Sequence, residues 1–290
     1  MLGGEAKEEE DRGMSRTRTL LEQHSVVDLF TLVYVAVDDY LQYSLEHHRY
    51  VLPESSDQKA SYSELMTISL MGDLLAEPYS GDWFVWVKHE YAPLFPRLPD
   101  VTRYYRVLCN LERIFADFAL VLANSLEDDT TYSIDSKPVP ICKYKRRKHP
   151  RAQGEAARGY GTQGAVFGFK LHAVINNAQM VCRFAVVPAN FADATLGKAL
   201  LHPEYDELER VLGDKAYLGT GAWTPPKSNA KQPGPWTLWM DNARKLIETV
   251  FSSLTRKGHL VLGQLNSFRS VRAKVCRKIA AHNFVRWLGL

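Results

Sequence analysis

The sequence has few of the features that mark zinc-binding, secreted or membrane proteins. Its 290 residues hold only four cysteines, with no C-x-x-C pair among them: Cys109, Cys142, Cys182 and Cys276. This scatter argues against a zinc ribbon and favours reduced, buried thiols. The pair His47-His48 has no acidic or cysteine neighbour at ligand spacing, so no zinc is expected there. No apolar run is long enough for a membrane span and no signal peptide is visible, which predicts a cytoplasmic protein.

A large net charge is also missing, because the formal charge at pH 7 is only +3. The charge is unevenly spread along the chain, which is more informative than its sum. Residues 1–18 are polar and rich in acidic side chains, so they are expected to form a disordered acidic tail. Basic residues gather instead at 143–151 and 269–278.

Residues 19–125 are predicted to form a helical domain. Apolar spacing predicts helices over 26–45, 64–76 (capped by Ser63) and 82–91, and a further helix begins at Val101 after the N-cap Asp100. One face of this last helix is polar and carries Arg103, Arg106, Asn110 and Arg113. A helix, a turn and a second helix with such a face is typical of helix-turn-helix DNA binding. A solvated face of a helical bundle gives the same pattern, so the domain is interpreted as serving DNA binding or dimerisation.

Residues 126–290 show a different pattern, in which strands alternate with helices. Residues 130–140 are expected to be a short strand that runs into a proline-containing loop, with Asp135 at the strand end. Further strands are expected over 168–176, 180–188, 209–213 and 235–240, the first two of these forming a hairpin around Asn176-Asn177. Helices are expected over 191–201, 203–208, 243–254 (capped by Asp241 or Asn242) and 270–288. A helical block followed by mixed strands and helices predicts an α+β fold with α/β-like character.

Three acidic residues stand where chemistry can use them. Asp135 and Asp214 each follow a predicted strand, and Glu248 borders the apolar stripe of a predicted helix, one turn after Arg244. Mg²⁺ prefers such oxygen ligands, and two ions about 4 Å apart can activate an attacking oxygen and stabilise a leaving one. Taken singly, each carboxylate is more often a solvated surface group, and only the fold can bring the three together.

Five short motifs occur in a fixed order between residues 134 and 252. They are Ile134-Asp135-Ser136-Lys137-Pro138, Tyr160-Gly161 followed by Gly168-Phe169-Lys170-Leu171-His172, Pro188-Ala189-Asn190, Gly213-Asp214-Lys215-Ala216-Tyr217, and Ile247-Glu248-Thr249-Val250-Phe251-Ser252. In these motifs and their order the chain resembles the DDE transposases of bacterial insertion sequences. The likeness is to the subgroup with a helical N-terminal region and no large inserted domain.

The resemblance implies a catalytic domain with an RNase H-like mixed sheet flanked by helices. It makes Asp135, Asp214 and Glu248 the catalytic carboxylates and the ligands of two Mg²⁺ ions, for which Mn²⁺ can substitute. The implied reaction is cleavage of transposon ends followed by strand transfer, with water and then a DNA 3′-hydroxyl as nucleophiles. The implied partners are double-stranded DNA, as terminal inverted repeats and target, and a second copy of the chain in a homodimer on DNA.

The chain departs from this pattern around the glutamate, where some relatives carry a Tyr, an Arg and a Lys. Arg244 matches the arginine, and it is expected to contact DNA. Asp241 stands at the tyrosine position and Thr255 at the lysine position, with Arg256 as the candidate replacement for the lysine. The interval between Asp214 and Glu248 is also short for this subgroup, which puts one helix before the glutamate in question.

A basic run follows the first aspartate, and we expect it to contact DNA phosphates. Its members are Lys143, Lys145, Arg146, Arg147, Lys148 and Arg151. Counterion release rewards such contacts, which position a protein on DNA without reading sequence. A solvated loop is the alternative.

His172 could contact a phosphate, but a position between strands is favoured. Trp223, Trp236 and Trp239 could stack on unpaired bases, as single-strand binders do, but ordinary core packing is favoured.

Two rival functions are compatible with the same motifs. One is an RNase H-like nuclease or junction resolvase that cuts without joining, and the other is a catalytically silent, DNA-binding transposase remnant. A phosphatase with an aspartyl nucleophile is disfavoured, because Asp135-Ser136-Lys137 lacks a second aspartate two residues on.

Overall fold

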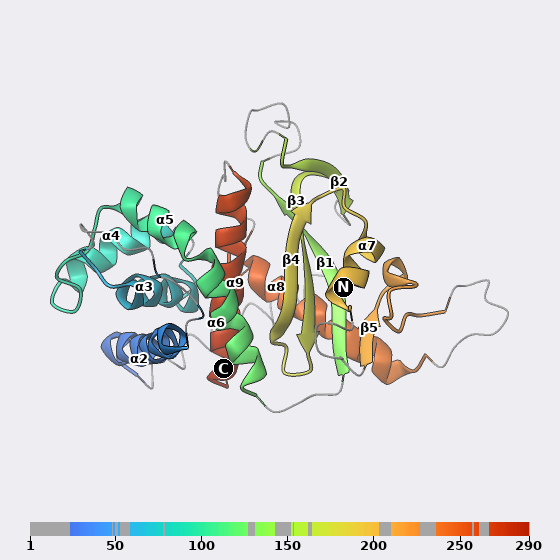
Figure 1. The fold of residues 1–290 in the computed structure, drawn as a ribbon, viewed down its shortest axis with the longest axis horizontal. Coiled ribbons are helices and arrows are strands. Elements are labelled where there is room, and N and C mark those ends of the chain that lie inside the picture. The colour runs from blue at the N-terminus through green and yellow to red at the C-terminus, as the bar shows by residue number, and fades with distance from the viewer. Residues whose placement is uncertain are drawn as a thin grey trace, which may run out of the picture. The chain divides into compact units, whose positions relative to one another are not determined.

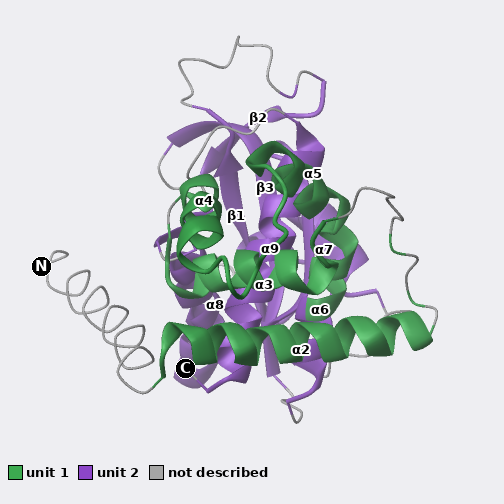
Figure 2. Ribbon diagram, turned by 90° about the vertical axis from the view of Figure 1, so that its left-hand side faces the viewer, with its two compact units in different colours: residues 1–118, 290 green, residues 119–289 purple. Residues whose placement is uncertain are grey.

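The computed structural model describes residues 24–47, 49, 52, 59–77, 79–126, 131–142, 152, 154–161, 164–202, 210–226, 236–256, 258–260 and 267–289. The chain divides into two compact units, residues 1–118 with 290 and residues 119–289 (Figure 2). The predicted acidic tail at 1–18 lies outside the described residues, as do the helical piece at 203–208 and the basic run at 143–151.

Among its described residues, the first unit consists of helices joined by loops, without strands. It contains α2 (Val26–Glu46), α3 (Tyr62–Leu74), α4 (Ser80–Glu90), α5 (Val101–Asn110) and the start of α6 (Glu112–Asn124). Helices α2 and α3 each begin with a capping box, in which a serine and the acidic residue three positions later exchange hydrogen bonds with each other's backbone. The cap of α3 is Ser61 and not Ser63 as predicted, because Glu64 completes the box from Ser61.

Aromatic rings fill the core of this unit. Phe30 of α2 contacts Trp83 and Phe95 with ring centroids 6.1 and 5.2 Å apart, and Phe84 stacks on Tyr104 at 4.0 Å. The indole N–H of Trp83 donates to the carbonyl oxygen of Ile68 at 2.7 Å, so this large side chain is buried with its polar atom satisfied. The amphipathic spacing of the helices therefore produces one packed aromatic core.

The second unit contains a mixed sheet of five strands among its described residues (Figure 1). The strands are β1 (Thr131–Pro140), β2 (Ala157–Gly161), β3 (Gly164–Asn176), β4 (Val181–Pro188) and β5 (Arg210–Gly213). Strand β3 pairs antiparallel with β1, β2 and β4, whereas β5 pairs parallel with the other edge of β1. The helices are α7 (Asp193–Leu200), the short 3₁₀ helix η2 (Lys215–Tyr217), α8 (Leu238–Arg256) and α9 (Phe268–Trp287).

The alternation of side chains along β1 assigns these helices to the two faces of the sheet. On one face, the Ser133 hydroxyl donates to the carbonyl oxygen of Ala243 in α8 at 2.9 Å. On the other face, Ile134 packs in a buried cluster with Val174 and with Tyr217 of η2. Asp135 shares the α8 face with Ser133 because it is two residues further along the strand.

The structure confirms the α+β fold, with helices at the N-terminus followed by a mixed sheet flanked by helices. The predicted hairpin is present as β3 and β4, and α9 and β5 lie where they were expected. The expectations for the start of α8 were wrong. Residues 238–240, predicted as part of a strand, form the first turn of α8, so Asp241 and Asn242 lie inside this helix and do not cap it.

Strand β1 also differs from its prediction, because it runs through Pro138 to Pro140 and so places Asp135 inside a strand. Strand β2, which pairs with the first half of β3, was not predicted. Among the described residues, none of the helices combines the length and the apolar character needed to cross a membrane.

Candidate active site

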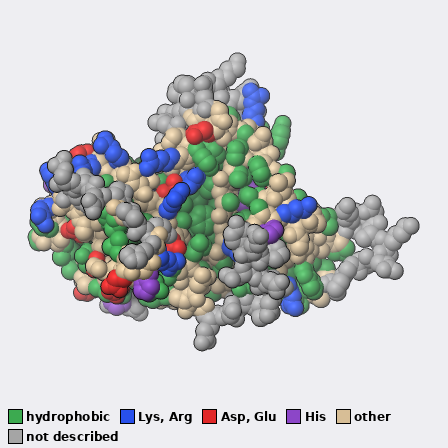
Figure 3. Space-filling model, viewed as in Figure 1, with side chains coloured by type: hydrophobic (Ala, Val, Ile, Leu, Met, Phe, Trp, Pro, Cys, Tyr) green, Lys and Arg blue, Asp and Glu red, His purple; other side chains and the backbone are tan. Residues whose placement is uncertain are grey.

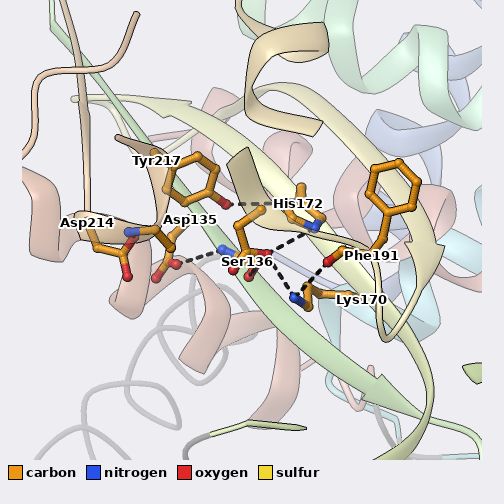
Figure 4. Close-up of polar contacts among 9 residues, drawn as sticks. Asp135, Ser136, Lys170, His172, Phe191, Asp214 and Tyr217 are labelled. Carbon is orange, nitrogen blue, oxygen red and sulfur yellow. Dashed lines mark hydrogen bonds and ion pairs between the residues drawn. The ribbon is translucent and has the colours of Figure 1, made fainter. Parts of the chain in front are cut away.

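Asp135 and Asp214 follow neighbouring positions on two parallel strands. The ladder between β1 and β5 ends at the pair Ile134 and Gly213, and each aspartate is the residue that follows this last pair in the chain. Paired strands lie about 4.8 Å apart, which brings the two aspartates together at the end of the β1–β5 ladder although they are distant in sequence. This end of the ladder, where β5 stops and β1 continues, is the centre of the candidate site (Figure 4).

Local hydrogen bonds hold both carboxylates. The backbone N–H of Ser136 donates to Oδ1 of Asp135 at 2.7 Å. Asp214 is the N-cap of η2, and its Oδ1 accepts from the backbone N–H of Ala216 at 2.8 Å. A capping aspartate has a fixed side-chain direction, because it satisfies a helix donor that otherwise lacks a partner.

The electrostatics of Asp135 show that acidic groups converge on it. Burial raises the pKa of its carboxyl to about 6, and the negative charges of Asp214 and Glu248 act in the same direction. The hydrogen bond from Ser136 and the positive charge of Arg244 oppose this rise in pKa. A buried carboxyl beside two further carboxylates is a site whose negative charge a cation would relieve.

Glu248 reaches this region from α8 but stays exposed. Its side chain is 59% accessible, and its Oε1 lies 3.6 Å from Nη1 of Arg244, one helical turn earlier. Arg244 also lies 3.8 Å from Asp241, and its Nε is buried without a hydrogen-bond partner among the described residues. No three acidic, histidine or cysteine side chains of the described residues stand close enough together to enclose one metal ion.

The predicted polar helix face is divided in the structure. Asp100 caps α5 as expected by accepting from the backbone N–H of Arg103 at 2.9 Å, but the helix ends at Asn110. Arg113 therefore belongs to α6 and not to the same helix as Arg103, Arg106 and Asn110. The connection between α4 and α5 spans residues 91–100, longer than the three or four residues of a helix-turn-helix turn.

The other basic residues give no single patch in the view of Figure 3, where the described Lys and Arg side chains lie in small groups. The basic run lies outside the described residues, and its six Lys and Arg side chains remain an expectation from sequence. Among the predicted DNA contacts that the structure describes, Arg244 is the one that lies beside the carboxylates, through its ion pair with Glu248.

Two further sequence interpretations have clear outcomes. His172 is fully buried on β3, so it lies between secondary-structure elements as favoured and is not available to a phosphate. Trp223 and Trp239, expected in the core, are instead 43% and 46% exposed, and the guanidinium of Arg210 lies 5.4 Å from the centre of each ring. This cation–π arrangement explains how two large rings stay ordered outside the core.

The sequence did not single out four residues that adjoin the site: Ser136, Lys170, Asp193 and Tyr217. One available signal was the spacing of Lys170 and His172, two polar residues on one face of a strand that is otherwise apolar. Nothing in the sequence connected Asp193 with them, because their contact is tertiary.

The second unit is therefore an α+β fold whose sheet brings two aspartates together at the end of a parallel strand pair. The stretch 126–225, about a third of the chain, matches the family model described as transposase DDE domain. The matched stretch contains Asp135 and Asp214, so the match confirms the resemblance to DDE transposases and supports a transposase-type function. No curated protein and no solved structure matches the chain.

Proposed function

We propose that the chain is a DNA transposase that cleaves the ends of its own element and joins them to target DNA. Asp135, Asp214 and Glu248 are its catalytic carboxylates, and its substrates are the terminal inverted repeats of a bacterial insertion sequence and a double-stranded target. The protein acts in the cytoplasm, as a homodimer on nucleoid DNA. One observation carries the proposal: Asp135 and Asp214 directly follow the last residue pair of the parallel ladder between β1 and β5, inside a stretch that matches a transposase DDE domain.

The donor atoms at this point fit a hard divalent cation. Carboxylate oxygens are the ligands that Mg²⁺ and Mn²⁺ accept. Burial, together with the nearby negative charges of Asp214 and Glu248, raises the pKa of Asp135, and a bound cation would offset both effects. Asp135 and Asp214 would hold the ion, and Glu248 would join them once its side chain leaves Arg244. When bound, two such ions supply activation of the attacking oxygen and stabilisation of the leaving one.

The residues of the chain have separate tasks in this proposal. Asp214 is oriented by its cap on η2, and Asp135 by the N–H of Ser136. Arg244 balances part of the acidic charge when the site holds no cation. Once a cation is bound, Arg244 becomes available to a DNA phosphate. The basic run after β1 is proposed to bind the phosphate backbone, and the Arg/Asn face of α5 to bind the element's ends.

A plasmid assay tests this function. The substrate carries the DNA that flanks the gene, with its inverted repeats, and the target is a second supercoiled plasmid. We expect Mg²⁺-dependent cleavage at the repeat boundary and covalently joined product. Cleavage without joined product would favour the nuclease or resolvase, and specific binding without cleavage would favour the silent remnant.

A further inference from the structure

Five polar side chains form a connected cluster close to the two aspartates, mainly on the face of the sheet opposite Asp135. They are Ser136 of β1, Lys170 and His172 of β3, Asp193 of α7 and Tyr217 of η2 (Figure 4). We propose that this cluster, called here the rear network, is a positioning unit that fixes Asp135 and Asp214 relative to each other. The proposal rests on the assignment of these two aspartates as the metal-binding carboxylates.

One carboxylate oxygen is the centre of the rear network. Oδ1 of Asp193 accepts hydrogen bonds from Nζ of Lys170 at 2.8 Å and from the hydroxyl of Ser136 at 3.2 Å. Nε2 of His172 lies 3.5 Å from the same oxygen. Asp193 thus ties the first turn of α7 to two strands of the sheet, and Lys170 adds a bond to the carbonyl oxygen of Phe191 at 3.3 Å.

Tyr217 connects the rear network to Asp214. Its hydroxyl lies 3.1 Å from Nδ1 of His172, and its ring is fully buried. It closes the short helix that Asp214 caps, and its backbone N–H donates to the carbonyl oxygen of Asp214 at 3.1 Å. Because Tyr217 is only three positions after Asp214, the anchored ring limits where the Asp214 carboxylate can lie.

Ser136 makes the equivalent connection to Asp135. Its backbone N–H donates to the Asp135 carboxylate, while its side chain bonds Asp193 on the opposite face of the strand. A displacement of Asp193 would therefore move a direct hydrogen-bond donor of Asp135. Asp135 is thus contacted by Ser136, and Asp214 by Tyr217. Ser136 in turn bonds Asp193, Tyr217 bonds His172, and the last two side chains lie 3.5 Å apart.

Burial and charge favour positioning over direct contact with DNA. His172 is fully buried and the side chain of Lys170 is only 12% exposed, so a phosphate cannot reach the first and barely reaches the second. Burial lowers the pKa of His172 to about 4, which makes the imidazole neutral at pH 7. The neutral imidazole shares a hydrogen bond with the Tyr217 hydroxyl through Nδ1, whereas Nε2 lies near Asp193 at 3.5 Å without a hydrogen-bond partner among the described residues.

The packing around Tyr217 leaves the rear network little freedom. A Cβ atom placed on Gly197 of α7 would lie 2.7 Å from Cδ1 of Tyr217, so only glycine lets the helix approach the ring this closely. A buried, connected polar network gains little net stability from its ion pair, but it specifies one arrangement of the elements that it joins. Supporting contacts of this kind commonly change metal affinity or activity by about 10- to 100-fold when removed.

The test uses Tyr217→Phe, which removes one hydroxyl, and Asp193→Asn, which removes the central charge. Mn²⁺ binding to the full-length, DNA-free protein is measured by calorimetry, and cleavage of pre-bound terminal DNA is measured alongside the affinity for that DNA. We expect Mn²⁺ affinity and the cleavage rate to fall by about 10-fold or more, with DNA affinity unchanged. Tyr43→Phe, on an exposed face of α2, is the matched control and should behave as wild type.

Two further variants separate the possible outcomes. Phe284→Leu weakens the buried core under α9 without touching the rear network, so an equal loss of Mn²⁺ affinity there would show a merely structural effect. Asp135→Asn tests the proposed function itself. If it abolishes cleavage while Tyr217→Phe and Asp193→Asn both match wild type, the positioning role is refuted and the function stands. If Asp135→Asn leaves Mn²⁺ binding and cleavage intact, the proposed function fails first.

Discussion

The chemistry proposed here begins with a single carboxyl group whose environment disfavours its charge. Asp135 is held in a strand, mostly shielded from water and within electrostatic reach of Asp214 and Glu248. A group in this position destabilises the folded protein when it ionises. The same unfavourable charge is what would make a bound divalent cation stabilising.

Asp135→Asn is therefore predicted to stabilise the metal-free protein at pH 7.5. Burial raises the folded pKa from 3.8 to about 6, so the folded state holds this proton more tightly than the unfolded chain. Stability consequently falls as pH rises between these two values, and the whole cost is present above about pH 6. The gain from Asn is at most about 3 kcal/mol at pH 7.5 and vanishes near pH 4.

Urea unfolding with a chelator at both pH values measures this difference. An equal destabilisation by Asp135→Asn at pH 7.5 and pH 4 would contradict the prediction, because it would show that the carboxyl contributes through hydrogen bonding alone.

Arg244 is predicted to hold down the pKa of Asp135. Its positive charge opposes the rise caused by burial, so Arg244→Gln should raise the pKa of Asp135 above about 6 in the metal-free protein. Carbon-detected NMR titration of the Asp135 carboxyl follows this directly. Lys245→Gln is the matched control, because Lys245 pairs with Asp241 at 2.7 Å and is not among the charges acting on Asp135. Equal shifts in both variants would show a non-specific charge effect.

At the scale of elements, the sequence predicted strands and helices best where apolar and polar side chains recur with a regular period. The hairpin of β3 and β4 was predicted because Phe169 and Leu171 alternate with Lys170 and His172. The extent of β1 was not predicted, because prolines normally end strands. They are tolerated here beyond Ile134, where β5 has ended and no other strand of the described residues pairs with that edge of β1.

Asn283 of α9 is predicted to be the residue that secures β4 to its covering helix. It is fully buried, and its amide accepts from the backbone N–H of Val181 and donates to the carbonyl oxygens of Val181 and Ala119, all at 2.8–2.9 Å. Asn283→Ala leaves these backbone groups without partners and should cost about 3 kcal/mol or more.

Urea unfolding checks this cost, with Asn124→Ala at the exposed end of α6 as control. A loss under about 1 kcal/mol for Asn283→Ala would mean that water replaces the amide and that the contact is not structural.

For the whole molecule, the order of the two proposed catalytic aspartates was predicted from the resemblance, and their closeness follows from the pairing of β1 with β5. The sequence could not show that Glu248 points to solvent and pairs with Arg244, because a helical pattern fixes a face but not a side-chain rotamer. Nor could it reveal the rear network, whose members come from four elements brought together only by the fold.

The two proposed DNA-binding regions should differ in salt dependence and in sequence preference. Replacing Lys145, Arg146, Arg147 and Lys148 with Ala should weaken binding to all DNA alike. Each lost phosphate contact lowers the slope of log affinity against log salt by about 0.9. Replacing Arg103, Arg106 and Asn110 should instead erode the preference for terminal DNA, by about 1–3 kcal/mol per lost base contact.

Binding to terminal and random DNA across a salt series separates these effects. An unchanged salt slope would mean that the basic run does not face DNA. An unchanged preference for terminal DNA would mean that α5 does not read bases and that the helical unit serves packing or dimerisation.

We propose that Asp135, Asp214 and Glu248 together carry out a metal-dependent joining reaction. A strand-transfer assay tests this most directly, with a terminal DNA fragment that already ends in a free 3′-hydroxyl and a supercoiled target plasmid. We expect joined product from the wild-type protein only with Mg²⁺ or Mn²⁺. We expect none from Asp135→Asn, Asp214→Asn or Glu248→Gln, each of which still binds terminal DNA. Joined product from any of these variants, or from the wild type in excess chelator, would contradict the proposal.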